Sequence, residues 1–317
     1  MDGKVTIEEH FALPETLGPG TPELHRRLQD FHGERIELMD RCGIAFAILS
    51  LNGPAVQAKT DTASAIDMAR RANDLLAEEI GKRRDRLGGF AALPMQDPEA
   101  AICELERAVS ELGLLGANVN GFSETTGSAS HLYYDRPEYR PFWAAIEKLD
   151  VPFYLHPRNP FFDDMPAFDG HPWLTYAAWA YALETAMHAL RLMCGGLFDD
   201  HPRLQMVLGH LGERIPFDLW RADNVLGKNP KGMPAQQTLR TYMQSNVHVS
   251  TSGQFYDPPL HLAIREMGVD RVLFSIDYPY ESMEQGSSWF DQAELSEAER
   301  LAIGRNNAVW LFGLELS

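Results

Sequence analysis

Short apolar runs rich in β-branched and aromatic residues alternate along this chain with longer segments of helical periodicity. This alternation is typical of repeated strand and helix units that build a parallel sheet. We count eight candidate strands, at residues 4–7, 45–50, 88–92, 116–119, 152–155, 205–209, 247–250 and 272–275. Helices are predicted over residues 22–40, 63–82, 97–112, 138–149, 178–198, 213–226, 236–244, 259–267 and 295–312.

Eight such units favour an α/β fold of the (β/α)₈ barrel type over an open doubly wound sheet, because no glycine-rich phosphate loop follows the first strand. The 317 residues, with 44% hydrophobic residues, suffice for one large core. No linker rich in Pro, Gly or Ser divides the chain, so we expect a single domain over residues 1–317. Insertions near 11–21 and 157–177 follow strands one and five, where barrel enzymes place their sites, and could act as lids.

Composition excludes several classes of function. The formal net charge of -17 and the lack of a Lys and Arg cluster argue against nucleic acid as a partner. The chain has no apolar run long enough to span a membrane and opens directly on a strand, so we expect a soluble, cytoplasmic protein without membrane partners. Cys42, Cys103 and Cys194 are widely separated and are expected to be buried thiols, which leaves imidazole and carboxylate as metal ligands.

Polar residues gather at the carboxyl ends of the predicted strands. Glu8 and His10 end the first strand, and two positions apart on an extended chain they point to the same side. His156 and Asp277 follow strands five and eight. A lone histidine after a strand is more often structural, but several such residues at one end of one barrel predict a site. We take Glu8, His10, His156 and Asp277 as ligands of a divalent ion that keeps a position open for substrate.

A second pair of residues has the features of a catalytic pair. His210 follows strand six, and Glu213 lies three residues further on at a helix start, where its carboxylate can orient the imidazole. Glu9 points away from Glu8 and His10 and is expected to serve packing or surface charge. His171, in the second insertion, is left open.

Eight motifs along the chain together carry a resemblance. The four at the strand ends are KVTIEEHFA (4–12), LHPRNP (155–160), LGHLGE (208–213) and FSIDYPYE (274–281). The others are LSLN (49–52), RAND (71–74), ALPMQDP (92–98) and YRPFW (139–143). With these motifs the chain resembles the amidohydrolase-superfamily decarboxylases nearly end to end, and within them the γ-resorcylate (2,6-dihydroxybenzoate) type.

The resemblance implies a distorted barrel, a homotetramer built as a dimer of dimers, and one divalent ion, Zn²⁺ or Mn²⁺ with Mg²⁺ possible, without an organic cofactor. It further implies metal-dependent, non-oxidative, reversible decarboxylation of an ortho-hydroxybenzoate such as 2,6-dihydroxybenzoate. Asp277 would be both ligand and proton donor, with assistance from His210 and Glu213.

Further residues are expected to bind the small aromatic acid. Asn52 could donate to a ring hydroxyl, and Arg221 could pair with an anionic group, although an ion pair on a helix surface explains Arg221 equally well. Aromatic residues could wall the ring. These residues are Phe11, Trp179, Tyr181 and Tyr280.

Two alternative functions use the same barrel. The ligands could activate a metal-bound water to hydrolyse a lactone or amide, with Asp277 as general base. Against this, hydrolytic relatives usually carry His-x-His where this chain has Glu8-x-His10. A metal-free binding barrel is the second alternative.

Overall fold

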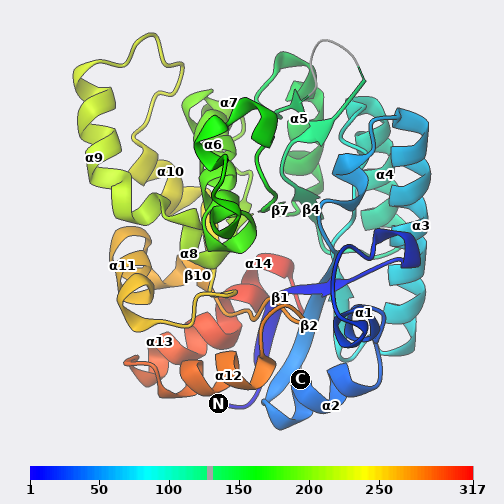
Figure 1. Ribbon diagram of the computed structural model, residues 1–317. Coiled ribbons are helices and arrows are strands. Elements are labelled where there is room, and N and C mark those ends of the chain that lie inside the picture. Colours follow the sequence, from blue (N-terminus) through cyan, green and yellow to red (C-terminus); the bar gives the residue numbers. More distant parts are fainter. Residues whose placement is uncertain (127–130, 317) are drawn as a thin grey trace.

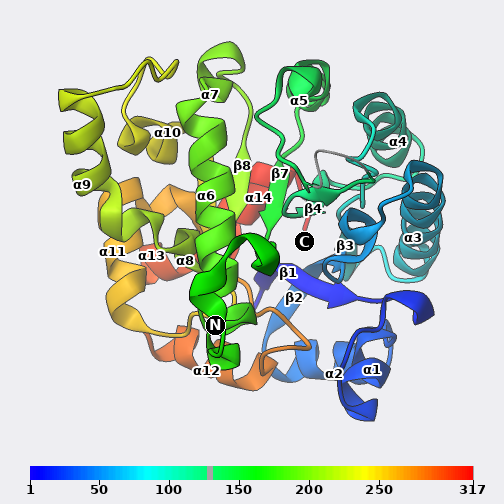
Figure 2. The ribbon, with the colours of Figure 1, turned by 45° about the horizontal axis from the view of Figure 1, so that its top comes forward.

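The fold is a (β/α)₈ barrel in which a ring of helices surrounds eight parallel strands (Figures 1 and 2). The computed structural model describes residues 1–126 and 131–316. Hydrogen bonding divides the strands into a sheet of order β1-β2-β3 and a sheet of order β10-β9-β8-β7-β4. Single parallel bridges join the two sheets, between Glu9 and Tyr278 at one seam and between Ala91 and Ala117 at the other. The predicted fold class is therefore confirmed.

The eight predicted strands are all present. They are β1 (Lys4–Phe11), β2 (Ile44–Leu51), β3 (Leu87–Gly89), β4 (Ala117–Asn120), β7 (Phe153–His156), β8 (Met206–Leu208), β9 (Val247–Ser250) and β10 (Val272–Leu273). A short antiparallel hairpin, β5 (Ser123–Glu124) with β6 (His131–Leu132), was not predicted, because strands of two residues carry no periodicity.

The long helices occur where periodicity predicts them. They are α3 (Thr62–Lys82), α4 (Pro98–Ser110), α5 (Arg140–Leu149), α9 (Ile215–Lys228), α10 (Leu239–Ser245) and α11 (Asp257–Met267). Short 3-10 turns fill the two insertions; they are Pro14–Thr16 after β1 and Phe162–Asp164, Pro166–Phe168, Pro172–Leu174 and Tyr176–Ala178 after β7.

Three predicted helices are divided. Segment 22–40 forms α1 (Pro22–Leu28) and α2 (Glu34–Arg41), with Gly33 as the N-cap of α2. Segment 178–198 forms α6 (Ala180–Cys194) and α7 (Leu197–Asp200), separated by glycines of which Gly196 has φ of 81°. Segment 295–312 forms α13 (Glu297–Leu301), a π-helical turn (Ala302–Asn306) and α14 (Asn307–Phe312).

The helix α12 (Met283–Gln292) was not predicted. Its sequence holds Gly286 and two serines, which are poor helix formers, so its periodicity was hard to recognise. Its stability comes instead from packing, because Met283 and Phe290 are buried in the core.

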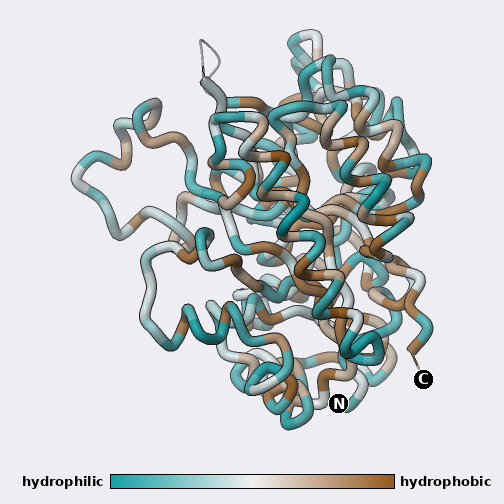
Figure 3. The backbone as a smooth tube through the Cα atoms, turned by 90° about the vertical axis from the view of Figure 1, so that its right-hand side faces the viewer, coloured by the Kyte–Doolittle hydropathy of each residue, from teal (hydrophilic) through white to brown (hydrophobic). Residues whose placement is uncertain are grey.

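The helices cover the barrel with one apolar face each, as α3 illustrates. Asp61 caps α3 by accepting a hydrogen bond from the Ser64 amide, and the buried residues recur with helical spacing at Ala65, Met68, Ala72 and Leu76. Figure 3 shows hydrophilic and hydrophobic residues alternating along the helices on this side. Among the described residues, no helix combines the length and the apolarity needed to cross a bilayer.

Apolar side chains fill the barrel below its carboxyl end. A cluster of strand residues, including Ile7, Phe46, Tyr154 and Leu273, packs against α14. The thiols follow the prediction only in part, because Cys42 is buried but Cys103 is exposed on α4. This packing holds the strands in place, so polar residues can occupy their carboxyl ends.

Candidate metal centre and active site

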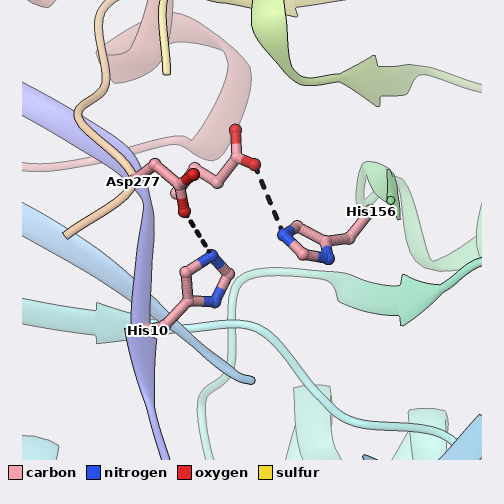
Figure 4. Close-up of side chains that lie close together, drawn as sticks. His10, His156 and Asp277 are labelled. Atoms are coloured by element: carbon pink, nitrogen blue, oxygen red, sulfur yellow. Dashed lines mark ion pairs between the residues drawn. The ribbon is translucent and has the colours of Figure 1, made fainter. Parts of the chain in front are cut away.

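The four predicted ligands converge at the carboxyl end of the barrel. Glu8 and His10 come from β1, His156 is the last residue of β7, and Asp277 follows β10. One ligand atom from each lies within 4.8 Å of the others. His10 Nε2 is 3.0 Å from Asp277 Oδ1, and His156 Nε2 is 3.5 Å from Glu8 Oε1. Figure 4 shows the side chains of His10, His156 and Asp277 directed toward one another.

Two of the atoms that face the centre of this cluster make no hydrogen bond to a described residue, whereas the other polar atoms of the same two side chains are held. Within the described part of the chain, buried Glu8 Oε1 and His10 Nε2 have no hydrogen bond. Glu8 Oε2, in contrast, accepts hydrogen bonds from the hydroxyls of Tyr154, Ser250 and Ser252. Buried polar atoms left unpaired are costly, so two carboxylates and two imidazoles in this arrangement fit a divalent cation.

Ionisation of the cluster agrees with this fit. Burial lowers the pKa of His156 well below its ordinary value, which keeps the imidazole neutral and able to bind metal. Burial alone would raise the pKa of Asp277, but the adjacent imidazoles of His10 and His210 outweigh it and hold that pKa well below its usual range. For Glu8, burial dominates and the pKa is raised. A cation at the centre would favour the ionised form of both carboxyls.

His210 and Glu213 form the expected pair. His210 Nδ1 is 2.7 Å from Glu213 Oε1, and His210 Nε2 is 3.7 Å from Asp277 Oδ2. Burial lowers the pKa of His210, but the negative charges of Glu213 and Glu8 outweigh it and raise that pKa well above the ordinary value. The His210 imidazole therefore has the charge and the position to carry a proton beside Asp277, and Glu213 keeps the ring oriented.

The backbone that presents this pair is left-handed. In α8 (His210–Glu213) the φ angles of His210, Leu211 and Glu213 are 51°, 54° and 51°, and Arg214 continues the turn at 70°. Residues other than glycine rarely adopt these angles. Gly253 leaves the space that the turn needs, since a Cβ there would lie 3.1 Å from His210 Cδ2 at a φ of +60°.

Three of the predicted substrate residues lie around the cluster. The Tyr280 ring centroid is 5.5 Å from that of His10, and burial raises the pKa of Tyr280 to about 12 while the nearby Asn52 side chain acts in the opposite direction. Asn52 is itself fixed, because its amide donates to the Thr16 carbonyl and accepts from the Thr16 hydroxyl. Burial raises the pKa of Tyr181 to about 12, and the charges of Tyr280 and Asp277 act in the same direction.

The other predicted substrate residues do not join them. Phe11 is 1% exposed and packs on Phe31 with ring centroids 5.5 Å apart, so its expected place in a pocket wall is corrected to the core. Trp179 is 48% exposed and stacks under Arg214, whose guanidinium carbon lies 3.5 Å from the ring centroid. Arg221 is exposed on α9, and no hydrogen bond or ion pair joins it to the cluster across the described residues.

Burial bears on two further residues. Glu9 is 0% exposed and accepts hydrogen bonds from Ser275, Ile276 and Tyr278, so the idea that it serves surface charge is wrong. His171 is exposed in the second insertion, where its ring centroid lies 5.2 Å from that of Trp173.

The hydroxyls around Glu8 and His10 were missed from sequence. Tyr154 is two residues before His156 on β7, and this spacing alone would have placed both side chains on one face of the strand. Ser50, at 3.2 Å from His10 Nδ1, and Ser250 lie inside predicted strands, where serine gives no signal of its own.

Comparisons with known proteins agree with this geometry. Residues 7–314 match the amidohydrolase family. The chain is 54% identical to the γ-resorcylate decarboxylase of Rhizobium sp. (strain MTP-10005), over 99% of both chains. A crystal structure of 2,6-dihydroxybenzoate decarboxylase complexed with 2,6-dihydroxybenzoate superposes with a TM-score of 0.96 at 54% identity, covering 99% of this chain and 100% of that chain.

A second solved structure carries a metal. The dihydroxybenzoic acid decarboxylase of Polaromonas sp. JS666, with bound manganese and the inhibitor 2-nitroresorcinol, superposes with a TM-score of 0.96 at 50% identity, covering 99% of this chain and 97% of that one. By the family match, by these likenesses over nearly the whole chain and by its own cluster of Glu8, His10, His156 and Asp277, this chain belongs to the amidohydrolase family.

Proposed function

We propose that this protein is a carboxy-lyase that catalyses the metal-dependent, non-oxidative and reversible decarboxylation of 2,6-dihydroxybenzoate to resorcinol and CO₂. The observation that carries the proposal is the buried cluster of Glu8, His10, His156 and Asp277, with unpaired atoms facing its centre, in a chain 54% identical to a γ-resorcylate decarboxylase. The unit that acts is the single barrel domain, and the 157–177 insertion could cover its open end.

The ion would stabilise negative charge on the substrate, and the side chains would transfer the proton. A divalent ion held by the four ligands would draw negative charge from the substrate carboxylate and the neighbouring phenolate. His210, whose pKa is raised and whose Nε2 lies 3.7 Å from Asp277 Oδ2, would pass a proton to the Asp277 carboxylate, and Asp277 would deliver that proton to the ring carbon that bears the substrate carboxylate. The new C–H bond interrupts aromaticity, and cleavage of the C–C bond releases CO₂ and restores it.

Substrate recognition would use the residues beside the cluster. Asn52 would donate to a ring hydroxyl, while Tyr280 and Tyr181 would wall the flat ring. Glu213 would bind Nδ1 of His210 and so keep the Nε2 atom of the ring directed at Asp277. Arg221 and Trp179 could contribute only from the surface on which they lie.

Three further features are part of the proposal. Manganese is the favoured metal, because the relative from Polaromonas holds it, and zinc is the alternative. A homotetramer would cover the exposed apolar side chains of α6 and α9, among them Met187, Phe217 and Trp220, which are 53%, 78% and 66% exposed. The proposed location is the cytoplasm.

The test is direct. Purified protein loaded with Mn²⁺ is incubated with 2,6-dihydroxybenzoate, and resorcinol and CO₂ are quantified; the reverse reaction is run from resorcinol in concentrated bicarbonate. Asp277→Asn should abolish turnover, whereas Glu284→Gln, which removes only an exposed ion pair with Arg41, should not. Lack of turnover with every ortho-hydroxybenzoate would refute the proposal, and incorporation of solvent oxygen without CO₂ release would point to the hydrolase.

A further inference from the structure

The barrel is closed between its first and last strands by very little regular ladder. β10 ends at Leu273, and the only bridge described between β1 and the segment that follows joins Glu9 to Tyr278. Two backbone hydrogen bonds accompany it, from His10 N to Tyr278 O at 2.7 Å and from Asp277 N to Glu8 O at 2.9 Å. Asp277 therefore sits on an irregular segment whose position depends on contacts with β1.

A side chain supplies the contacts that the ladder lacks. Glu9 Oε1 accepts from the Ser275 hydroxyl at 3.1 Å and from the Ile276 amide at 3.2 Å, and Glu9 Oε2 accepts from the Tyr278 amide at 3.0 Å. Ile276 and Tyr278 flank Asp277, so one carboxylate holds the backbone on both sides of it. Asp277 itself has φ of 80°, a left-handed angle that is unfavourable outside glycine and persists only where the surroundings enforce it.

The charge of Glu9 is balanced by a cation equally deep in the protein. Arg35, on α2, is 0% exposed and its charge acts on Glu9. Its Nη2 atom donates to the His10 carbonyl at 2.6 Å, and its guanidinium carbon lies 4.9 Å from the ring centroid of Tyr278. Burying two opposite charges is expensive and is a weak route to stability, so a role in fixing one geometry explains their burial better than packing does.

We propose that Glu9 is a positioning residue for Asp277. Its carboxylate fixes the left-handed turn at the end of the last strand and so sets where the Asp277 carboxylate meets the metal site and His210. This inference rests on the proposed function, which makes Asp277 a metal ligand and proton donor.

A double-mutant cycle tests the inference. Mn²⁺ affinity of the metal-free protein is measured by electron paramagnetic resonance for wild type, Glu9→Gln, Asp277→Asn and the double variant. Glu9→Gln keeps the size of the side chain but sets an amide nitrogen against a backbone N–H. Because residues that orient ligands typically change metal affinity by about 10–100-fold, we expect a loss of about 10-fold in wild type and of less than about 2-fold in Asp277→Asn.

Controls separate positioning from general destabilisation. Glu104→Gln alters another buried carboxylate, one bonded to Asn73 and Arg107 on the outer helices, and should leave the Mn²⁺ affinity unchanged. If Glu9→Gln weakens Mn²⁺ binding equally in both backgrounds, or does not weaken it in wild type, Glu9 does not act through Asp277. If wild type fails to bind Mn²⁺, it is the proposed function that fails.

Discussion

The hydroxyls around Glu8 allow one prediction to be worked out in detail. Tyr154→Phe removes a single oxygen from a side chain that is 0% exposed and keeps the ring that packs edge-on against Phe90. The lost hydrogen bond goes to Oε2 of Glu8, where the hydroxyls of Ser250 and Ser252 remain. The change is therefore confined to one of three donors on one oxygen of one proposed ligand.

The magnitude follows from the charge of the acceptor. A hydrogen bond to a charged group contributes about 1.5–3 kcal/mol, and every 1.4 kcal/mol is about tenfold in binding. Burial already raises the pKa of Glu8, and removing a donor would raise that pKa further, so the metal must displace a proton more often. We therefore expect Tyr154→Phe to weaken Mn²⁺ binding by about 10–100-fold.

Isothermal titration of metal-free protein with Mn²⁺ at pH 7 measures the effect. The matched control is Tyr139→Phe, since Tyr139 is also 0% exposed but donates to the Met95 carbonyl, outside the cluster. Tyr139→Phe should destabilise the fold without changing Mn²⁺ affinity. A change of less than about threefold in Tyr154→Phe would refute the reasoning, because Glu8 would then be held without this hydroxyl.

Further predictions concern the catalytic pair, the metal and pH. Glu213→Gln should lower kcat by about 10–100-fold while Mn²⁺ affinity stays within about threefold, since it leaves the four ligands untouched; a parallel loss of affinity would contradict the assigned role. Removal of divalent metal by a chelator should abolish decarboxylation and lower Tm, and Mn²⁺ should restore both; activity that survives chelation would exclude a metal mechanism. Burial lowers the pKa of His188 and of His248 to about 3 in the folded protein. In the unfolded chain a histidine has a pKa of about 6.5, so below that pH the unfolded chain binds protons that the folded chain does not. The contribution of these two histidines to the free energy of unfolding is therefore fully present above about pH 6.5 and is lost as the pH falls toward about 3. Urea unfolding should show a loss of at most about 2 kcal/mol per histidine at pH 5. His248→Gln should flatten this dependence, and an unchanged slope would show that His248 is not responsible.

The strands and the four-residue cluster at their ends could be predicted from sequence because both depend on local patterns. β1 and β7 are apolar runs that end in polar residues, and parallel strands of a barrel bring those ends together whatever the loops do. Glu8, His10, His156 and Asp277 were found in this way.

What could not be predicted depends on contacts distant in sequence. Burial of Glu9 follows from the seam with Tyr278, almost the whole length of the chain away, and Phe11 enters the core because α1 and α2 bring Phe31 against it. α12 was missed for the same reason, since tertiary packing overrides its weak propensity.

The left-handed turn at His210 has a consequence for how the protein withstands change. Four residues other than glycine, His210, Leu211, Glu213 and Arg214, have positive φ, at about 1–2 kcal/mol each, so the turn holds roughly 4–8 kcal/mol of unfavourable energy. The net stability of a folded domain is typically about 5–15 kcal/mol, so the surrounding barrel must hold the turn in place. Glycine at Leu211 would relieve part of this energy but would also loosen the histidine. The proposed proton carrier therefore lies on a strained backbone turn, and we expect local opening to begin there before the barrel unfolds.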